Sequence, residues 1–226
     1  MNKNVCYTCI IGNYDKLKDP KYITDNFDYI CFTNNKNLKS DIWKIIFIDK
    51  EFNNKISQTK FQRYLKINPH KSLYKYDFSI YVDGNIIIND DLNNIKNNIC
   101  NKNVSIYLKP HPQRTCTYME SFACVYYGKD TLENTSKQLL KYWIEGFPPN
   151  YGLSETNILC RYHNNKDCIR LMELWSNEIL NNSHRDQLSL FYSIWKLKMK
   201  NNIYMYNNED MKYINKCFIC DYRHNS

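Results

Sequence analysis

The sequence has few of the residues that interrupt regular structure, and it has no long apolar run. Glycine occurs 5 times and proline 6 times in 226 residues, which argues against a low-complexity or loop-dominated chain. No stretch approaches the roughly 18–20 consecutive apolar residues that a membrane-spanning helix needs. Residues 1–6 also lack the apolar core of a signal peptide. We therefore expect a cytoplasmic protein that is neither secreted nor membrane-spanning, with a peripheral position at a membrane left open.

Composition indicates one globular domain with a basic surface. Hydrophobic residues make up 43% of the chain and aromatic residues 15%, which is enough for a packed core. We expect a single domain over residues 1–226, with a C-terminal tail from about residue 203 packed on it. Lysine and arginine number 31 against 23 acidic residues, a net charge of +8. This charge is spread along the chain and fits a nucleotide diphosphate, another polyanion or an anionic membrane surface.

Ten cysteines in a chain without a secretion signal predict mostly free thiols in a reducing compartment. Cys6-x-x-Cys9 and Cys217-x-x-Cys220 have the spacing of zinc ligands. However, Cys6 and Cys9 lie within a predicted strand, where their odd separation places them on opposite faces. We therefore expect no zinc site, and expect Cys217 and Cys220 to pack the C-terminal tail.

Strand-like and helix-like segments alternate, which predicts an α/β fold with a mostly parallel sheet flanked by helices. Expected strands cover residues 5–11, 29–33, 43–48, 77–82, 104–108 and 157–161, and expected helices cover residues 57–68, 131–145, 167–180 and 186–198. Ligands bind such sheets beyond the carboxyl ends of the strands. Polar residues that follow Ile11, Thr33 and Val82 are therefore the first candidates for a site.

The most informative segment is Asp83-Gly84-Asn85, directly after a hydrophobic strand. A period of two brings the Asp83 carboxylate and the Asn85 amide oxygen to the same side of the chain. Oxygen ligands of this kind suit Mg²⁺ or Mn²⁺ with phosphate oxygens completing the shell. The simpler interpretation is an Asp-Gly turn after a strand.

Two further segments carry basic or mixed charge. Arg63 and Lys66 share a face of a predicted helix and can clamp a diphosphate, unless they form an ordinary solvated face. His111-Pro112-Gln113-Arg114, followed by Glu120, places three ionisable side chains on a proline-bounded loop.

Two more segments place a carboxylate next to a regular element. Glu155 precedes a hydrophobic strand, where it is either a site residue or a strand-edge charge. Ser183-His184-Arg185-Asp186-Gln187 opens the last long helix. Ser183 and Asp186 resemble a capping box, although the segment has more polar groups than a cap requires.

Seven short motifs in one order carry a family resemblance. They are Thr8 through Asp15, Asp28 through Thr33, Arg63-x-x-Lys66-x-x-Pro69-His70, Tyr81-Val82-Asp83-Gly84-Asn85, His111-Pro112-x-Arg114, Gly152-Leu153-x-Glu155 and Arg185-Asp186-Gln187-Leu188-Ser189. From about Thr8 to Trp195, the chain is similar to the TOD/MUCI-type glycosyltransferase-like family. The resemblance implies a GT-A fold, in which a nucleotide-binding sheet of Rossmann type carries an Asp-x-Asp metal motif. Here the third position of that motif is Asn85, which puts strict dependence on Mn²⁺ or Mg²⁺ in doubt.

The resemblance also implies an activity and roles for residues. It implies metal-assisted transfer of a sugar from a nucleotide-diphosphate donor, expected to be a UDP-sugar, to a hydroxyl of a glycan, a lipid-linked acceptor or a protein. The expected donor-binding residues are Thr8, Gly12, Tyr14, Arg63, Lys66, Asp83, His111, Arg114 and Gln187, and the expected metal ligands are Asp83, Asn85 and His184. The expected general base is Asp186, with Glu155 second, although a helix N-terminus lowers the pKa of an Asp there.

Two alternatives of other classes stay open. The first is a catalytically silent module that binds a nucleotide-sugar, which the Asn85 departure allows. The second is a nucleic-acid-binding protein, since 20 tyrosines and a charge of +8 offer stacking and phosphate contacts. Because the basic residues form no stripe and no binding motif is present, we expect no nucleic-acid partner.

Overall fold

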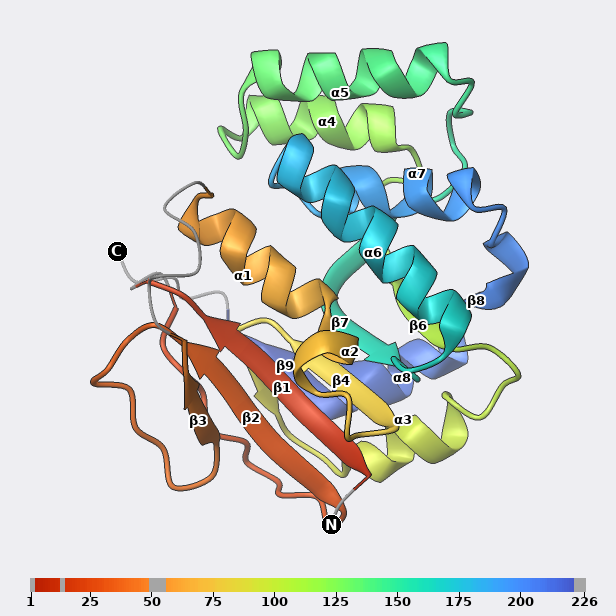
Figure 1. Cartoon of the computed structure of the whole chain (residues 1–226). Helices are drawn as coiled ribbons and strands as arrows, with labels where there is room; N and C mark the ends of the chain where they lie inside the picture. The colour runs from red at the N-terminus through yellow and green to blue at the C-terminus, as the bar shows by residue number, and fades with distance from the viewer. Residues whose placement is uncertain (1–2, 13–14, 49–55, 222–226) are drawn as a thin grey trace.

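A seven-stranded sheet forms the centre of the computed structural model, which describes residues 3–12, 15–48 and 56–221 (Figure 1). The strand order is β3-β2-β1-β4-β7-β6-β8. β7 runs antiparallel to both of its neighbours, whereas β1 pairs parallel with β2 and β4. The strands are β1 (Asn4–Ile10), β2 (Phe27–Thr33), β3 (Lys44–Phe47), β4 (Phe78–Val82), β6 (Ile106–Pro110), β7 (Ser154–Arg161) and β8 (Ile203–Met205). The expected α/β architecture with a mostly parallel sheet is confirmed.

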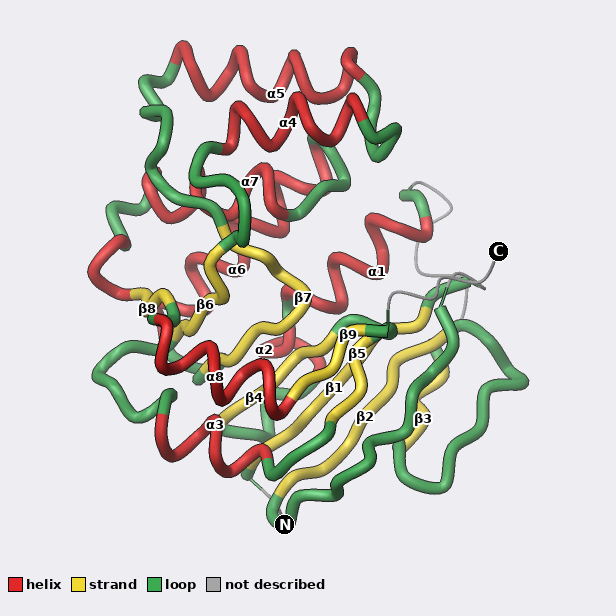
Figure 2. Tube along the Cα trace, turned by 180° about the vertical axis from the view of Figure 1, so that it is seen from behind, coloured by secondary structure: helices red, strands yellow, loops and turns green. Residues whose placement is uncertain are grey.

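Helices cover both faces of this sheet. Figure 1 shows α1, α2 and α6 in front of it, and Figure 2 shows α3, α8 and a small second sheet, β5 with β9, behind it. The α4–α5 hairpin lies beyond α7, away from β1–β3, in both views. The helices are α1 (Gln58–Ile67), α2 (Pro69–Ser72), α3 (Leu92–Asn98), α4 (Thr117–Tyr126), α5 (Leu132–Ile144), α6 (Lys166–Asn181), α7 (Gln187–Lys196), the 3₁₀ turn η1 (Lys200–Asn202) and α8 (Asn208–Cys217); the small sheet is β5 (Ile86–Ile88) with β9 (Phe218–Cys220).

Alternate residues of β1 divide between two hydrophobic cores. Tyr7 and Cys9 pack in the core under α1 and α6, whereas Cys6 and Ile10 pack in the core under α3 and α8. This is the period of two that a strand buried on both faces requires. The predicted placement of Cys6 and Cys9 on opposite faces is confirmed, and all ten cysteines, which lie in the described ranges, are free thiols.

The helix α4 and the C-terminal elements were absent from the sequence prediction. α4 buries Glu120 and exposes Met119, Phe122 and Tyr126. This reversal of the usual polar and apolar faces removes the signal by which an amphipathic helix is recognised. The residues from Ile203 onward add β8 to the central sheet and then form α8 and β9.

No helix in the described ranges combines the length and the apolar character that crossing a membrane requires.

Candidate functional site

A cavity of about 610 Å³ opens beyond the carboxyl ends of β1 and β4. Its walls come from the end of β1 and the loop after it, the first turns of α1, the turn after β4, the α4–α5 turn and the segment before α7. The lining residues are Cys9, Ile11, Asp15, Gln58, Thr59, Gln62, Arg63, Asp83, Asn85, Gly128, Lys129, His184 and Arg185. The edge of the sheet at which sequence reasoning expected a site therefore carries a cavity.

The Asp83 carboxylate, directly after the end of β4, is held in one orientation by hydrogen bonds. Its Oδ1 accepts a hydrogen bond of 2.8 Å from the Tyr81 hydroxyl and one of 3.3 Å from Lys66 Nζ. Tyr81 in turn accepts a hydrogen bond of 2.8 Å from Gln62 Nε2. Both contacts to the carboxylate use the same oxygen. A side chain held in this way presents its charge to the cavity in one direction.

Lys66 lies beneath the cavity between two carboxylates. Its side chain is 1% exposed, and Nζ lies 2.7 Å from Asp186 Oδ2 as well as 3.3 Å from Asp83 Oδ1. Arg63 Nε approaches the same Asp186 oxygen at 3.5 Å. Burial alone would raise the pKa of Asp186, but the charges of Lys66 and Arg63 outweigh it and hold that pKa well below its usual range. Arg63 and Lys66 were expected to clamp a diphosphate together. In the structure Arg63 lines the cavity, whereas Lys66 lies below it in a buried network of ion pairs.

Asp186 occupies the N-cap position of α7, yet its side chain makes no capping hydrogen bond. The expected capping box with Ser183 is wrong: Ser183 Oγ accepts from the Arg185 backbone N–H at 3.0 Å and donates to Asp130. The Asp186 carboxylate instead reaches Lys66. Because a buried, paired carboxylate with a lowered pKa is a weak proton acceptor, the geometry favours a positioning role for Asp186 over the expected general-base role.

The C-terminal end of α1 is anchored by a buried arginine that sequence reasoning missed. Arg161, at the end of β7, is fully buried and donates from Nη2 to the Lys66 carbonyl at 3.0 Å and from Nη1 to the Ile67 carbonyl at 3.4 Å. Tyr7 also donates its hydroxyl to the Lys66 carbonyl and accepts from Arg161. A cation at the last carbonyls of a helix is stabilising. Arg161 thereby fixes the backbone from which Lys66 extends.

His184 lines the cavity next to a second buried carboxylate. Its Nδ1 lies 3.8 Å from Asp130 Oδ2, and Asp130 is held by the Thr131 N–H at 2.7 Å and by Asn134 at 3.1 Å. Burial lowers the pKa of His184; Asp130 opposes this shift, whereas nearby cations, Arg185 first, add to it. The imidazole is consequently neutral near pH 7.

Asp83 and Asn85 reach the cavity together, and Asp15 from the loop after β1 joins them there. Two carboxylates and an amide oxygen, with phosphate oxygens to complete the shell, are a donor set that suits Mg²⁺ or Mn²⁺. No three His, Cys, Asp or Glu side chains in the described part of the chain form a metal-binding group of their own. His184 lines the same cavity with its Nδ1 toward Asp130, and its expected role as a metal ligand stays a prediction. The sequence signal that could have identified Asp15 is its position three residues after Gly12, in the loop that follows the first strand.

A smaller hollow of about 340 Å³ adjoins the cavity at the ends of β1 and β2, and Asp15 lines both. Gly12 lines this hollow with φ +75° and donates its N–H to Asn34 Oδ1 at 2.8 Å. A Cβ on Gly12 would lie 2.6 Å from Gln58 Oε1, the movable end of a side chain, so the positive φ is the main reason for glycine at this position. Thr8 is buried within β1 and lines neither space, and Tyr14 lies outside the described residues.

The remaining expected site residues mostly bind one another. Arg114 Nε lies 2.5 Å from Glu120 Oε2, and His111 Nε2 lies 3.5 Å from the same oxygen. Glu155 pairs with Lys109 at 2.6 Å across β6 and β7. None of these residues lines the cavity. Their donor-binding and catalytic roles stay predictions.

Gln187 lies at the start of α7 and is mostly buried. Its Nε2 donates to the Ser154 carbonyl at 3.4 Å, and its Oε1 accepts from Arg185 at 3.3 Å. Arg185 lines the cavity, so Gln187 contacts a wall of the site without lining it. Arg185 and Lys129 are cavity residues to which sequence reasoning gave no role. Little in the sequence singles them out, because lysine and arginine occur along the whole chain and no one of them stands apart.

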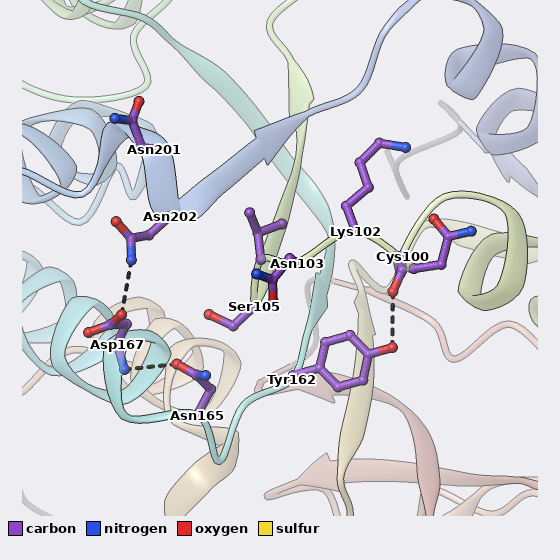
Figure 3. Close-up of a pocket in the computed structure, with 11 residues that line it drawn as sticks. Cys100, Lys102, Asn103, Ser105, Tyr162, Asn165, Asp167, Asn201 and Asn202 are labelled. Atoms are coloured by element: carbon purple, nitrogen blue, oxygen red, sulfur yellow. Dashed lines mark hydrogen bonds between the residues drawn. The ribbon is translucent and has the colours of Figure 1, made fainter.

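A third hollow of about 300 Å³ lies at the amino ends of β6 and β8 (Figure 3). Two hydrogen bonds join residues of its lining: Asn202 donates to Asp167 at 2.9 Å, and the Tyr162 hydroxyl donates to the Cys100 carbonyl at 2.9 Å. This hollow lies at the opposite end of the parallel strands from the cavity at Asp83.

Comparison with known families agrees with this geometry. A family model described as TOD1/MUCI70, glycosyltransferase-like domain, matches residues 1–220. No curated protein matches the chain.

Proposed function

Because the chain belongs to the TOD1/MUCI70 glycosyltransferase-like family, we propose that it is an enzyme that transfers a sugar from a nucleotide-diphosphate donor to an acceptor hydroxyl. The donor class we infer is a UDP-sugar. The acceptor is a hydroxyl of a glycan, a lipid-linked saccharide or a protein. The proposal rests on one observation above all: carboxylates and fixed cations face the same cavity at the carboxyl ends of β1 and β4.

The charges that line the cavity support a diphosphate as part of the ligand. Arg63, Lys129 and Arg185 bring three positive charges, whereas Asp15 and Asp83 bring two negative ones. When the bond from the anomeric carbon to the phosphate oxygen breaks, its electron pair leaves with the nucleoside diphosphate. Fixed cations next to that oxygen stabilise the charge that develops there. We infer that the nucleoside would occupy the adjoining hollow at Gly12, which shares Asp15 with the cavity.

Asp83 and Asn85, with Asp15, are the residues that would hold a divalent cation. A bound Mg²⁺ or Mn²⁺ would act as a Lewis acid toward the two phosphates. The protein supplies the orientation: Tyr81 and Lys66 both bind Oδ1 of Asp83 and fix its carboxylate plane. Lys66 also moderates the negative charge of that carboxylate, so we expect modest metal affinity in the absence of nucleotide.

For a transfer with inversion, the structure offers His184 as the proton acceptor. The new bond joins the acceptor oxygen to the anomeric carbon, and the hydroxyl proton passes to Nε2 of the neutral imidazole. Asp130 Oδ2 lies 3.8 Å from Nδ1, so its charge would stabilise the imidazolium that forms. Asp186 is buried and paired with Lys66, and we infer that it holds the Lys66 ammonium in place below the cavity.

Calorimetry with UDP and UDP-sugars, in Mn²⁺ and in EDTA, tests donor binding. We expect binding in the micromolar range that is stronger with Mn²⁺, and a thermal shift that rises with ligand concentration. The matched control is Lys102→Ala, a change on the opposite side of the molecule, which should leave binding intact. Absence of binding by every nucleotide-sugar would contradict the proposal. Binding without hydrolysis or transfer of any donor would instead favour a silent module.

A further inference from the structure

The strand β9 ends next to Asn85, one of the residues that line the cavity. β9 pairs antiparallel with β5, with Ile86 opposite Cys220, and Figure 2 shows the two strands side by side. β5 begins directly after the turn that carries Asp83 and Asn85. The pairing therefore brings Cys220 and Asp221, which are distant in sequence, to the turn at the edge of the cavity.

Asn85 is bound by the end of β9 through both its backbone and its side chain. Its carbonyl accepts a hydrogen bond of 2.9 Å from the Asp221 backbone N–H, and its Nδ2 donates to Cys220 Sγ at 3.4 Å. The nitrogen and the oxygen of an amide point in different directions, so this contact turns Oδ1 away from the sulfur. Because Asn85 lines the cavity, Oδ1 is the amide atom that a ligand can reach there.

The end of β9 also holds the loop that follows β1. Asp221 Oδ2 lies 3.0 Å from Lys18 Nζ, and 8% of the Asp221 side chain is exposed. The Lys18 carbonyl accepts a hydrogen bond of 3.0 Å from Trp43 Nε1, so the backbone of this loop is held as well. Lys18 lies three residues after Asp15, which lines the cavity. Asp221 thus joins the segment that carries Asp15 to the strand that binds Asn85.

Gly84 brings these two segments into direct contact. A Cβ at Gly84 would lie 2.5 Å from Ile10 Cδ1 and 2.9 Å from Asp15 Cβ. The Cβ of Asp15 moves only with its backbone, so a residue without a side chain is needed for this close approach. Asp15 therefore packs against the turn between Asp83 and Asn85. A shift of either segment would change how the three side chains lie relative to one another.

We propose that the end of β9 is a positioning element for the divalent cation of the donor complex, an inference that rests on the proposed function. Cys220 directs Oδ1 of Asn85 into the cavity. Asp221 holds, through Lys18, the loop that carries Asp15. A divalent cation binds the oxygen of an amide and not its nitrogen, so rotation of the Asn85 amide would remove one ligand. Loss of a group that orients a metal ligand commonly lowers the affinity for the metal by about 10–100-fold.

Variants of Cys220 separate orientation of the Asn85 amide from packing. In Cys220→Val the side chain keeps a similar size but gives Nδ2 of Asn85 no acceptor. We expect the strengthening of UDP binding by Mn²⁺, measured by calorimetry, to fall by about tenfold. Binding in EDTA and the thermal midpoint should match the wild type. Cys220→Ser keeps an acceptor and should recover most of the Mn²⁺ effect. The matched control is Ile219→Val in the same strand, which should retain the effect in full.

Chemical modification gives an independent test on the wild-type chain. All ten cysteines lie in the described ranges, and Cys220 alone among them is not buried. Methyl methanethiosulfonate should therefore react there first: the thiolate attacks the sulfenyl sulfur, forms a methyl disulfide and releases methanesulfinate. We expect the singly modified protein, identified by mass spectrometry, to lose most of the Mn²⁺ effect. Reduction of the disulfide with dithiothreitol should restore it.

The outcomes distinguish the positioning role from the premise on which it rests. A full Mn²⁺ effect in Cys220→Val or in the modified protein would overturn the proposal and leave the proposed transferase intact. So would a Cys220→Val protein with a lower thermal midpoint and weaker UDP binding in EDTA, because Cys220 would then act through the stability of the fold. If UDP binds the wild type equally in Mn²⁺ and in EDTA, there is no cation to position. The proposal would then fail together with the cation of the proposed function.

Discussion

Lys66 Nζ lies 2.7 Å from Asp186 Oδ2, in a space where the two side chains are 1% and 4% exposed. The same ammonium lies 3.3 Å from Asp83 Oδ1 at the cavity. One buried cation therefore connects the start of α7 to the end of β4. Because a buried charge is tolerated only when it is paired, neither carboxylate can change without affecting the position of the other.

Removal of this cation should destabilise the fold strongly. In Lys66→Met, two carboxylates lose their shared partner, and breaking a buried ion pair in this way costs about 3–5 kcal/mol. For a chain of this size we expect the thermal midpoint to fall by roughly 10 °C. Differential scanning calorimetry measures the change.

The control for Lys66→Met is Lys137→Met, which removes an exposed lysine paired with Glu133. Its effect should stay below about 1 kcal/mol. The double variant Lys66→Met/Asp186→Asn should recover part of the lost stability, because it removes one of the two unpaired charges. A Lys66→Met protein as stable as the wild type would contradict the ion-pair network.

Replacement of Asp186 should separate a positioning role from a general-base role. The pKa of Asp186 is lowered in the folded protein, so its ion pair stabilises the fold above the ordinary Asp value of about 4 and is lost as the pH falls below it. Asp186→Asn should therefore reduce stability at neutral pH and flatten the acid limb of the stability curve. If Asp186 only positions the site, kcat should fall by about tenfold or less. A loss of several orders of magnitude with unchanged stability would restore the base role.

The location of the site was predictable from the sequence, but its internal pairing was not. A buried strand that ends in Asp83 indicates the carboxyl edge of a parallel sheet, and that inference needs only local patterning. Helical spacing placed Arg63 and Lys66 on one face. Which of the two side chains faces the cavity depends on the position of Asp186 at the start of α7, because Asp186 pairs with Lys66. That position is set by the packing of α6 and α7, and no local pattern encodes it.

Local rules failed where tertiary contacts overrode them. Asp186 stands at the start of a helix three residues after Ser183, so capping was the natural prediction. The buried Lys66 ammonium is a stronger partner for its carboxylate than a backbone N–H. α4 was missed for a related reason. It buries Glu120, which pairs with Arg114, and exposes apolar side chains to the outside.

The buried His163 should make stability depend on pH in the weakly acidic range. Burial lowers the pKa of His163 to about 4, while its Nε2 lies 3.1 Å from the Leu73 carbonyl. Between pH 4 and 6.5 the unfolded chain binds a proton at this residue and the folded protein does not. The free energy of unfolding should therefore rise with pH through this window, by about 3 kcal/mol from His163. Urea titrations at several pH values measure this free energy. In His163→Gln it should rise less steeply with pH between 4 and 6.5, even if the variant is less stable at every pH. An unchanged slope would mean that His163 titrates normally.

The proposed base predicts a pH profile. Because burial lowers the pKa of His184, kcat should decrease only when the pH falls below the ordinary histidine value of about 6.5. His184→Gln should reduce kcat by about 100-fold or more and leave donor affinity unchanged. Asp130→Asn removes a charge that raises this pKa, so the acid limb should move to lower pH. A His184→Gln enzyme with the wild-type profile would exclude the assignment.

Asp83 should determine how metal and nucleotide binding are coupled. In Asp83→Asn the side chain keeps its shape and an oxygen that can accept from Tyr81, but it loses the charge that a divalent cation requires. Calorimetry should therefore show that Mn²⁺ no longer strengthens UDP binding, whereas binding in EDTA, which depends on Arg63 and Arg185, stays within a few-fold of wild type. Asp90→Asn, a carboxylate change at the Lys216 pair, is the control and should retain the full effect of Mn²⁺. If Mn²⁺ strengthens binding equally in Asp83→Asn and the wild type, the cation is held elsewhere. If it strengthens binding in neither, the fixed cations alone neutralise the diphosphate, because Lys66 already occupies one face of the carboxylate.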